Sequence, residues 1–337
     1  MERPLRAAVI GLGAMGANHV RVYTEIAGVE VVGVADTDPD RVARATAGRT
    51  FPGFPDAATL LAEASPDIVS VVVPTTSHEA VALQALEAGC HVLVEKPIAA
   101  SLEAANRVAA AAAACGRLLT VGHIVRFNPA VSDLKRRLAE GQGGRVLEVQ
   151  TRRVGPFPHR IRDVGVIHDL ATHDIDIMRY LLGDDVATVY AVAQSHINTA
   201  NEDLVSAMLH FQGGVIGTLD VNWLTPTKER TLTVLCERGM FVVDHEAQSL
   251  TFYENFAARA REGAIASVTE GPMTRYPIAY QEPLRLELER FRDAVRQAGP
   301  PPVSARDGIA AIAVAEAMVR SASIGAPVPV DEVGAQP

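Results

Sequence analysis

The chain has 337 residues, of which 48% are hydrophobic and 21% charged, and its formal net charge is −9. This length exceeds what one hydrophobic core usually serves, so two globular domains are expected. The acidic balance disfavours nucleic acid and anionic membranes as partners. No uninterrupted apolar stretch of about 18 residues occurs, so no membrane span is expected. Three cysteines, odd in number and far apart, are typical of reduced thiols, and we expect a cytoplasmic protein.

The first elements of the chain predict a dinucleotide-binding unit. The apolar run 5–10 predicts a strand and the run 29–35 a second one, with a turn and a helix between them. In the turn, the first glycine permits a tight bend, the second lets the backbone approach a pyrophosphate, and the third lets helix and strand pack closely. A plain glycine-rich turn is the alternative. The predicted cofactor contacts of this turn are Gly11, Leu12, Gly13, Ala14, Met15 and Gly16.

Asp36 ends the second predicted strand and completes the pattern. A carboxylate there can accept hydrogen bonds from both ribose hydroxyls and would repel a 2′-phosphate, which favours NAD over NADP. Arg41 is the nearest base, so NADP stays an alternative. A turn residue without a ligand is the structural alternative for Asp36.

The alternation of strands and helices continues to about residue 124. Apolar runs at 66–73, 91–94 and 118–124 predict strands with helices between them. Such alternation predicts a parallel sheet that binds its ligands at the carboxyl ends of the strands. Two segments at such ends are predicted to contact the cofactor: Val73, Pro74 and Thr75 with His78, and Glu95, Lys96 and Pro97.

The second part of the chain predicts an α+β domain. A helix is expected near Pro129 and another over 164–182. Alternating stretches such as 214–224 predict an open, largely antiparallel sheet with helices on one face. The expected fold class is therefore α/β, with a Rossmann domain over 1–124 and a substrate-binding domain over 125–337. An alternative is that the two C-terminal helices of the substrate-binding domain pack back on the first domain.

With the glycine turn, the proline-containing strand ends and Asp169-Leu-Ala-Thr-His173, the chain resembles the Gfo/Idh/MocA oxidoreductase family over essentially its whole length. The resemblance implies an NAD-dependent sugar dehydrogenase in which Lys96, Asp169 and His173 are catalytic and contact the substrate. It also implies a homodimer or homotetramer formed through the free face of the C-terminal sheet. One departure is that many members carry consecutive glycines before the aspartate, where this chain has Gly165 alone.

The residues support these roles independently. A lysine at the end of a buried strand is unusual, although a solvated loop lysine is the alternative for Lys96. On an α-helix, Asp169 and His173 are four residues apart and share a face, so Asp169 can orient the imidazole. An exposed Asp–His pair is the alternative. A metal site made of His173 and the two following aspartates is disfavoured, because helical neighbours do not converge on one ion, and no metal is expected.

The substrate prediction comes from residues 151–162, which hold four arginines and no acid. Arginine binds phosphate oxygens through its planar fork, while a solvated basic loop or a subunit salt-bridge patch is the alternative. Residues 152–166 and 122–131 are also similar to family members acting at C3 of UDP-linked 2-acetamido sugars. This narrower resemblance implies substrate contacts by Arg126, Asn128, Arg153, Arg160 and Arg162.

The predicted reaction is NAD-dependent oxidation of a sugar hydroxyl to a ketone, on a sugar or nucleotide sugar. Three alternatives stay open. The substrate is instead an inositol or a free or phosphorylated sugar; the chain is a redox-inactive sensor of dinucleotide and sugar; or tightly held NAD is used transiently in a non-redox reaction.

Overall fold

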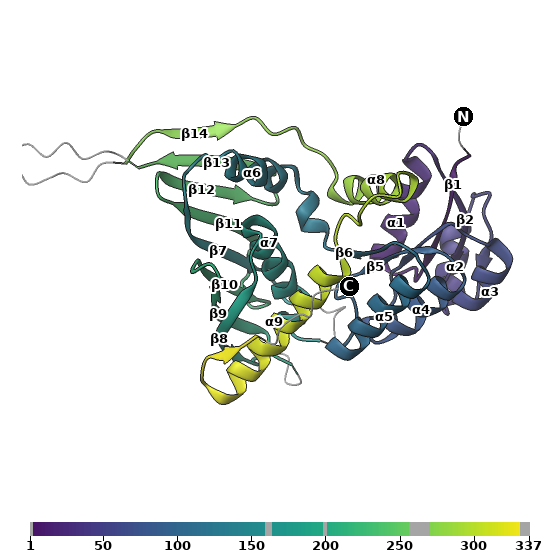
Figure 1. The fold of residues 1–337 in the computed structure, drawn as a ribbon. Helices are drawn as coiled ribbons and strands as arrows, with labels where there is room; N and C mark the ends of the chain where they lie inside the picture. The colour runs from purple at the N-terminus through teal and green to yellow at the C-terminus, as the bar shows by residue number, and fades with distance from the viewer. Residues whose placement is uncertain (1–2, 159–163, 198–200, 256–269, 331–337) are drawn as a thin grey trace, which may run out of the picture. The chain divides into compact units, whose positions relative to one another are not determined.

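The computed structural model describes residues 3–158, 164–197, 201–255 and 270–330, which form two compact units (Figure 1). The first unit contains the described chain up to Ile124 together with Glu282–Ala313. The second contains the described residues of Val125–Gln281 and those from Val314 onward. The first unit thus holds Glu282–Ala313 from the predicted second domain, in line with the alternative that the C-terminal helices pack back on the first domain.

The described strands of the first unit form a parallel sheet in the order β3-β2-β1-β4-β5-β6. The order reverses between β1 and β4, and doubly wound sheets bind ligands at this point, outside the carboxyl ends of the strands. The residues of β4 are all buried, as expected for a strand covered on both faces. The strands are β1 (Leu5–Ile10), β2 (Val29–Ala35), β3 (Gly53–Phe54), β4 (Ile68–Val71), β5 (His91–Glu95) and β6 (Leu119–Gly122).

Helices connect these strands, and two of them, α2 and α3, were not predicted. Asp38 caps α2 by accepting from the backbone N–H groups of Asp40 and Arg41 at 2.9 and 3.3 Å, with Pro39 at the first helical position. This Asp-Pro start is a helix signal that sequence reasoning passed over. The helices are α1 (Ala14–Glu25), α2 (Pro39–Thr46), α3 (Ala57–Ala64), α4 (His78–Glu87) and α5 (Leu102–Ala114), and the turn η1 (Thr75–Ser77) precedes α4.

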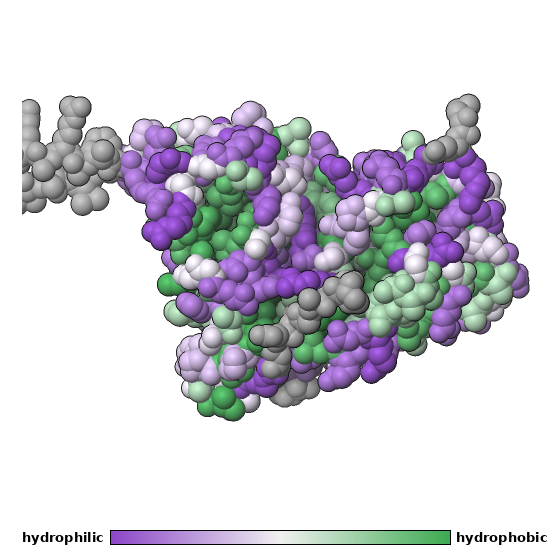
Figure 2. Space-filling model, viewed as in Figure 1, coloured by the Kyte–Doolittle hydropathy of each residue, from purple (hydrophilic) through white to green (hydrophobic). Residues whose placement is uncertain are grey.

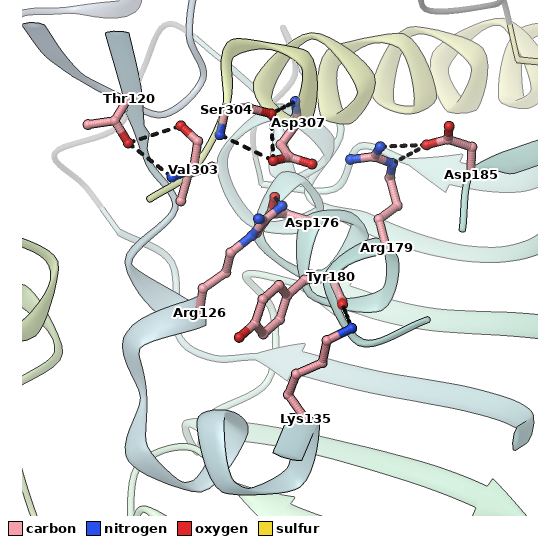
Figure 3. Close-up of polar contacts among 10 residues, drawn as sticks. All are labelled: Thr120, Arg126, Lys135, Asp176, Arg179, Tyr180, Asp185, Val303, Ser304 and Asp307. Carbon is pink, nitrogen blue, oxygen red and sulfur yellow. Dashed lines mark hydrogen bonds and ion pairs between the residues drawn. The ribbon is translucent and has the colours of Figure 1, made fainter. Parts of the chain in front are cut away.

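The returning segment completes the core of the first unit with α8 (Pro283–Arg296) and the beginning of α9 (Ala305–Ile324). The hydroxyl of Thr120 on β6 donates to the carbonyl of Val303 at 3.0 Å and accepts from its N–H at 3.1 Å (Figure 3). Each fully buried large apolar side chain contributes about 1.5–3 kcal/mol. The buried cluster shared by α1 and α8 includes Val20, Tyr23, Leu284, Leu288 and Phe291.

The second unit is built on a mixed sheet in the order β14-β13-β12-β11-β7-β10-β9-β8-β15. Neighbouring described strands are antiparallel except β7 and β10, which are parallel, so the fold-class prediction is confirmed. The strand β8 was not predicted. The strands are β7 (Val146–Val154), β8 (Val186–Gln194), β9 (Leu204–Phe211), β10 (Ile216–Asn222), β11 (Glu229–Cys236), β12 (Gly239–Asp244), β13 (Ser249–Glu254), β14 (Met273–Tyr276) and β15 (Val328–Pro329).

Helices cover one face of this sheet. The covering elements are α6 (Pro129–Ala139), the π-helical turn η3 (Ile167–Ala171), α7 (Thr172–Leu182) and the part of α9 from Val314 onward, with η2 (Ile124–Phe127) before α6 (Figure 1). Side chains of β10 alternate as predicted: Leu219 and Val221 are buried, while Thr218 and Asp220 face the other side. Trp223, directly after β10, is buried and packs edge-to-face on Phe157 at 5.7 Å between ring centroids.

The opposite face of the sheet is open and carries exposed apolar side chains. Tyr190 on β8 and Met208 on β9 are cross-strand partners there, and Met208 is 54% exposed. Large exposed apolar residues on one face mark interaction surfaces. Assembly through this open face stays a prediction. Others on the same face are Val192, Ile216, Leu235, Tyr253 and Met273.

Within the described ranges, no helix is long and apolar enough to cross a membrane. The longest of them, α9, has 20 residues. On the side of the molecule that Figure 2 shows, hydrophilic side chains are interspersed with apolar ones.

Candidate active site

The turn between β1 and α1 has the geometry of a phosphate-binding cradle. Gly11 has a φ of +94°, and a Cβ atom there would lie 2.3 Å from the carbonyl oxygen of Val72. A Cβ on Gly16 would lie 1.9 Å from the carbonyl oxygen of Gly11. Both positions therefore exclude a side chain. A Cβ on Gly13 would meet no described atom within 4 Å, so this glycine leaves open space into which a ligand phosphate fits.

The other residues of the turn also support a phosphate-binding cradle. Leu12 is buried, Ala14 begins α1 with an exposed side chain, and Met15 packs against the core. Gly13 is the N-cap residue of α1, and no described side chain caps this helix. The positive end of the helix dipole and its first N–H groups are therefore well suited to an anion.

Asp36 follows β2, and its carboxylate is held against the glycine turn. The N–H of Leu12 donates to Oδ2 at 2.6 Å, and the N–H of Asp38 donates to Oδ1 at 2.9 Å. Arg41 Nη1 lies 3.5 Å from Oδ2. A carboxylate oxygen accepts more than one hydrogen bond, so Asp36 keeps acceptor capacity for ribose hydroxyls while it orders the turn.

His78 braces the loop Val73-Pro74-Thr75 that follows β4. Its Nε2 lies 2.9 Å from the carbonyl oxygen of Val73, and its Nδ1 lies 2.7 Å from the carbonyl oxygen of Pro97. The ring therefore joins the ends of β4 and β5. Because both ring nitrogens face backbone carbonyls, the predicted direct cofactor contact by this imidazole is replaced by a positioning role. Burial lowers the pKa of His78, and the two hydrogen bonds oppose that shift.

Glu95, at the end of β5, is the last member of a buried hydrogen-bonded chain. His19 Nε2 donates to Glu95 Oε1 at 3.1 Å, and His19 Nδ1 lies 3.1 Å from Ser70 Oγ. Tyr23 Oη lies 2.9 Å from the same oxygen of Ser70. Because a carboxylate only accepts, donation from Tyr23 to Ser70, then to His19 and on to Glu95 satisfies each group in turn. Sequence spacing offered no signal for His19 or Ser70.

This chain supports the segment that carries Lys96. The N–H of Lys96 donates to Glu95 Oε2 at 3.2 Å, and the peptide bond to Pro97 is cis. Burial opposes ionisation of Glu95, but His19 and Lys96 together hold its pKa below the usual value. Gly122 lies opposite Glu95 on β6 and leaves room for it, since a Cβ there would lie 3.0 Å from the carboxyl carbon of Glu95.

In the second unit, the predicted continuous α-helix over 164–182 is wrong at its beginning. Ile167–Ala171 form a π-helical turn, and α7 starts at Thr172. Asp169 lies in the π turn and His173 in α7, so the α-helical spacing rule does not describe their relation. Both side chains are half-buried. The Thr172 hydroxyl donates to the carbonyl of His168 at 3.0 Å, which satisfies a group in the wider turn. Wide turns of this kind often occur at functional sites.

Gly165 and Glu202 fix the start of this turn. Glu202 Oε1 accepts from the N–H of Ile167 at 3.0 Å, and its backbone carbonyl accepts from Val166 at 3.0 Å. A Cβ on Gly165 would lie 2.1 Å from the Glu202 carboxylate. The lone glycine in place of consecutive glycines is thus the position that makes room for this cap. Burial lowers the pKa of His168, partly offset by Glu202 and Glu316.

Two arginines predicted to bind substrate form buried ion pairs with α7. Arg126 donates to both oxygens of Asp176 at 2.7 and 2.6 Å and stacks on Tyr180 at 4.9 Å (Figure 3). Arg153 donates to both oxygens of Asp174 at 2.9 and 3.0 Å. Their forks are occupied by aspartates, so we correct their assignment from substrate contact to positioning of α7. Sequence spacing did not reveal these pairs, because each joins segments far apart in the chain.

The remaining substrate predictions have different outcomes. Asn128 Oδ1 accepts from Ala130 at the start of α6, and its Nδ2 donates to the carbonyl of His245, both at 3.0 Å, so its side chain is structural. Arg160 and Arg162 lie outside the described residues. Arg152 faces the open side of the sheet beside Asp220, opposite to its neighbour Arg153. The two described arginines of this segment therefore lie on opposite faces of the sheet.

Among the described residues, no group of three His, Cys, Asp or Glu side chains is arranged to hold a metal ion. The first unit instead offers a glycine cradle, an uncapped helix start and an ordered carboxylate. These features fit a dinucleotide: Gly13 and the start of α1 would receive the pyrophosphate, and Asp36 would face a ribose. Lys96 directly follows β5, two strands from β1 in the sheet, and a cation at this strand end can stabilise charge on a substrate oxygen.

Comparison with known proteins agrees with this geometry. Residues 5–123 match a family model described as an oxidoreductase family with an NAD-binding Rossmann fold, and residues 131–242 match the GFO/IDH/MocA C-terminal domain. UDP-N-acetylglucosamine 3-dehydrogenase of Acidithiobacillus ferrooxidans is 31% identical over 86% of this chain and 88% of its own. Inositol 2-dehydrogenase 1 of Saccharopolyspora erythraea is 34% identical over 97% and 96%.

The solved structure of the Acidithiobacillus ferrooxidans enzyme matches with a TM-score of 0.85, covering 96% of this chain and 99% of that one at 28% identity. The resemblance read from the motifs, and NAD as the cofactor, are thereby confirmed. The chain belongs to the Gfo/Idh/MocA family of NAD-binding oxidoreductases.

Proposed function

We propose that the protein oxidises the C3 hydroxyl of a UDP-linked 2-acetamido sugar to a ketone, with NAD as the hydride acceptor. Membership of the family carries the oxidoreductase chemistry. The identity of the sugar rests on one observation, the similarity to UDP-N-acetylglucosamine 3-dehydrogenase over 86% of the chain.

Three side chains have proposed chemical roles. His173 takes the proton of the reacting hydroxyl, Asp169 orients the imidazole, and Lys96 donates a hydrogen bond to the same oxygen. Bound NAD would supply the position that receives the hydride. General acid–base assistance contributes roughly 10²–10⁴-fold in rate. The buried chain that ends at Glu95 serves the reaction by holding the backbone of Lys96 in place.

Fewer arginines remain as proposed contacts of the UDP phosphates than the sequence predicted. Arg153 is paired with Asp174, and Arg152 faces the open side of the sheet. The proposed phosphate contacts are therefore Arg160 and Arg162. Remote binding energy of this kind positions the reacting ring, so a truncated substrate loses kcat as well as affinity.

A second candidate is inositol oxidation. It is favoured by the 34% identity to inositol 2-dehydrogenase 1 over 97% of this chain, a match as extensive as that to the nucleotide-sugar enzyme. An inositol has neither a diphosphate nor an acetamido group. The two candidates therefore differ in their need for a phosphate anchor.

The test follows NADH formation with UDP-N-acetylglucosamine, its uronic acid derivative and myo-inositol in parallel, with a ketone trap to draw the oxidation forward. Turnover of a nucleotide sugar, with weak turnover of free N-acetylglucosamine, supports the proposal. Efficient turnover of inositol with no response to either nucleotide sugar refutes it in favour of the second candidate.

Variants assign the chemistry within the same assay. Lys96→Met and His173→Asn should each abolish most turnover and leave NAD affinity nearly intact, because neither residue belongs to the glycine cradle. Asp169→Asn should cost less than loss of His173. An absence of turnover with every sugar would favour the sensor alternative, and product without net NADH would favour transient use of NAD.

A further inference from the structure

Three basic side chains form a row across the helix-covered face of the second sheet. Arg153 on β7 pairs in register with Arg230 on β11. The N–H of His245, directly after β12, donates to the carbonyl of Arg230 at 3.0 Å, which continues the ladder. Directly opposed residues on neighbouring strands leave the sheet on the same face. Because Arg153 contacts Asp174 on α7, the Arg153 end of the row lies beneath that helix.

Arg230 differs from the other arginine of this row. Arg153 makes two short hydrogen bonds to its aspartate, whereas the contact of Arg230 with a described carboxylate is a 3.5 Å approach of Nε to Glu246. Glu246 already accepts from Lys228 Nζ at 2.8 Å. Burial, and then the charge of Arg153, lower the pKa of Arg230, while Glu246, Asp174 and Asp169 oppose that shift. About a third of the Arg230 side chain, 35%, remains exposed, so a ligand can reach it.

His245 supplies a second, independent observation. Both of its ring nitrogens are buried, and neither has a hydrogen-bond partner among the described residues. Burial, with the charges of Arg153 and Arg230, lowers the pKa of His245 to about 3. The neutral ring carries one N–H donor and one acceptor nitrogen. Buried polar atoms in native proteins are partnered in the great majority, so these nitrogens point to a bound group.

The row lies near the proposed catalytic segment of the same unit. Both Asp169 in the π turn and Asp174 in α7 act electrostatically on Arg230. Asp174 is neutralised by Arg153, so Arg230 retains capacity for a further anion. A group held by Arg230 would therefore lie on the side of the sheet that Asp169 faces.

We propose that Arg230 and His245 bind an oxyanion of the sugar substrate, a carboxylate or a phosphate. Arg230 contributes the charge and the planar fork, and His245 contributes one N–H. The inference rests on the proposed function, because it takes the bound molecule to be the sugar substrate. It makes the pair a determinant of specificity, because a neutral polyol gains nothing from the guanidinium charge.

The test measures binding by calorimetry to the full chain with NAD present, using D-glucuronate, glucose 6-phosphate and D-glucose as matched probes. Wild-type protein should bind glucuronate or glucose 6-phosphate at least about 10-fold more tightly than glucose, and the preferred anion identifies the source. Arg230→Gln should lose about 10- to 100-fold in affinity for that anion, as expected for charged hydrogen bonds. Its affinity for glucose should not change.

Two further variants and one control sharpen the result. Arg230→Lys keeps the charge but not the fork and should retain part of the affinity, while His245→Phe should lose less than Arg230→Gln. They also replace Arg230→Gln if that variant fails to fold. As a control, Arg145→Gln changes an exposed arginine that directly precedes β7 and pairs with Glu237, and this variant should bind like wild type.

Wild-type protein that binds both anions no more tightly than glucose overturns the proposal, as does an Arg230→Gln variant with unchanged anion affinity. Repeating the titrations in Lys96→Met separates this result from catalysis. If Lys96→Met loses turnover but still prefers the anion over glucose, the proposed oxyanion site is supported. If the protein turns over a nucleotide sugar but Arg230→Gln does not change anion binding, the oxyanion site is refuted. The proposed function is then still supported.

Discussion

Replacing His19 by leucine tests whether the buried chain beneath Lys96 supports the first unit. His19 is fully buried, and its two ring nitrogens lie 3.1 Å from Glu95 Oε1 and 3.1 Å from Ser70 Oγ. Leucine has no polar atom in its side chain. The substitution therefore removes both hydrogen bonds while the site stays filled by an apolar group.

The magnitude follows from the partner left behind. Glu95 is 9% exposed and keeps its carboxylate when His19 is lost. Leaving a buried carboxylate without its hydrogen-bond donor costs about 1–3 kcal/mol. Glu95→Gln removes the charge, so the double variant should be less destabilised than the sum of the single changes, with a coupling of about 1–3 kcal/mol.

The effect also has a defined pH dependence. His19 helps to hold the pKa of Glu95 below its usual value of 4.5. A depressed carboxyl pKa in the folded state contributes stability that is present above the unfolded value and is lost as pH falls through the folded one. The difference in stability between wild type and His19→Leu should therefore be full at neutral pH and shrink below about pH 4.5.

Hydrogen exchange followed by mass spectrometry measures this locally. In His19→Leu, the free energy of exchange protection of peptides from β5 should fall by the cost of losing His19. Peptides from β10 in the second unit should keep their protection and serve as the internal control. NAD affinity gives a second readout of the first unit. Protection of β5 within about 0.5 kcal/mol of wild type, the range of an ordinary surface change, would refute the reasoning.

Three further predictions follow from the structure. Gly122→Ala should destabilise the first unit by about 1–3 kcal/mol in urea unfolding and lower kcat, because its Cβ would press on Glu95 at 3.0 Å; an unchanged midpoint and kcat would contradict this. Asp36→Ala should weaken NAD about 10-fold and relax discrimination against NADP in direct titrations, since one lost charged hydrogen-bonding group corresponds to roughly this factor; tighter binding of NADP by the wild type would reverse the assignment. Met208→Glu should shift light-scattering mass toward the monomer by placing a charge on the open face, and an unaltered mass would exclude this part of the face from assembly.

The sequence by itself determined the parts of the protein that depend on local pattern. The strand–glycine–helix order around Gly11 and Gly16 specifies the cofactor cradle, because turn geometry and helix start lie within one short segment. Continuous apolar runs predicted buried parallel strands, and strict alternation predicted the half-covered sheet. The glycine turn, the strand-end segments that include Lys96, and the segment from Asp169 to His173 together carried the family resemblance before any contact was known.

Only the tertiary structure decided which partner each charged side chain finds. Arg152 and Arg153 are adjacent in sequence but leave β7 on opposite faces, so Arg152 forms exposed ion pairs with Asp220 and Glu229 while Arg153 forms a buried one with Asp174. Strand alternation is readable from sequence, yet the element that covers a face comes from elsewhere in the chain. A predicted substrate arginine thus became a structural one.

The same reason explains the residues that sequence reasoning missed. His19 and Glu95 are 76 positions apart but meet at 3.1 Å, because the start of α1 and the end of β5 lie at the same edge of the sheet. Arg230 and His245 become neighbours of Arg153 only through the pairing of β7, β11 and the end of β12. Pairing register is a long-range property that side-chain burial and folding of the whole sheet impose together.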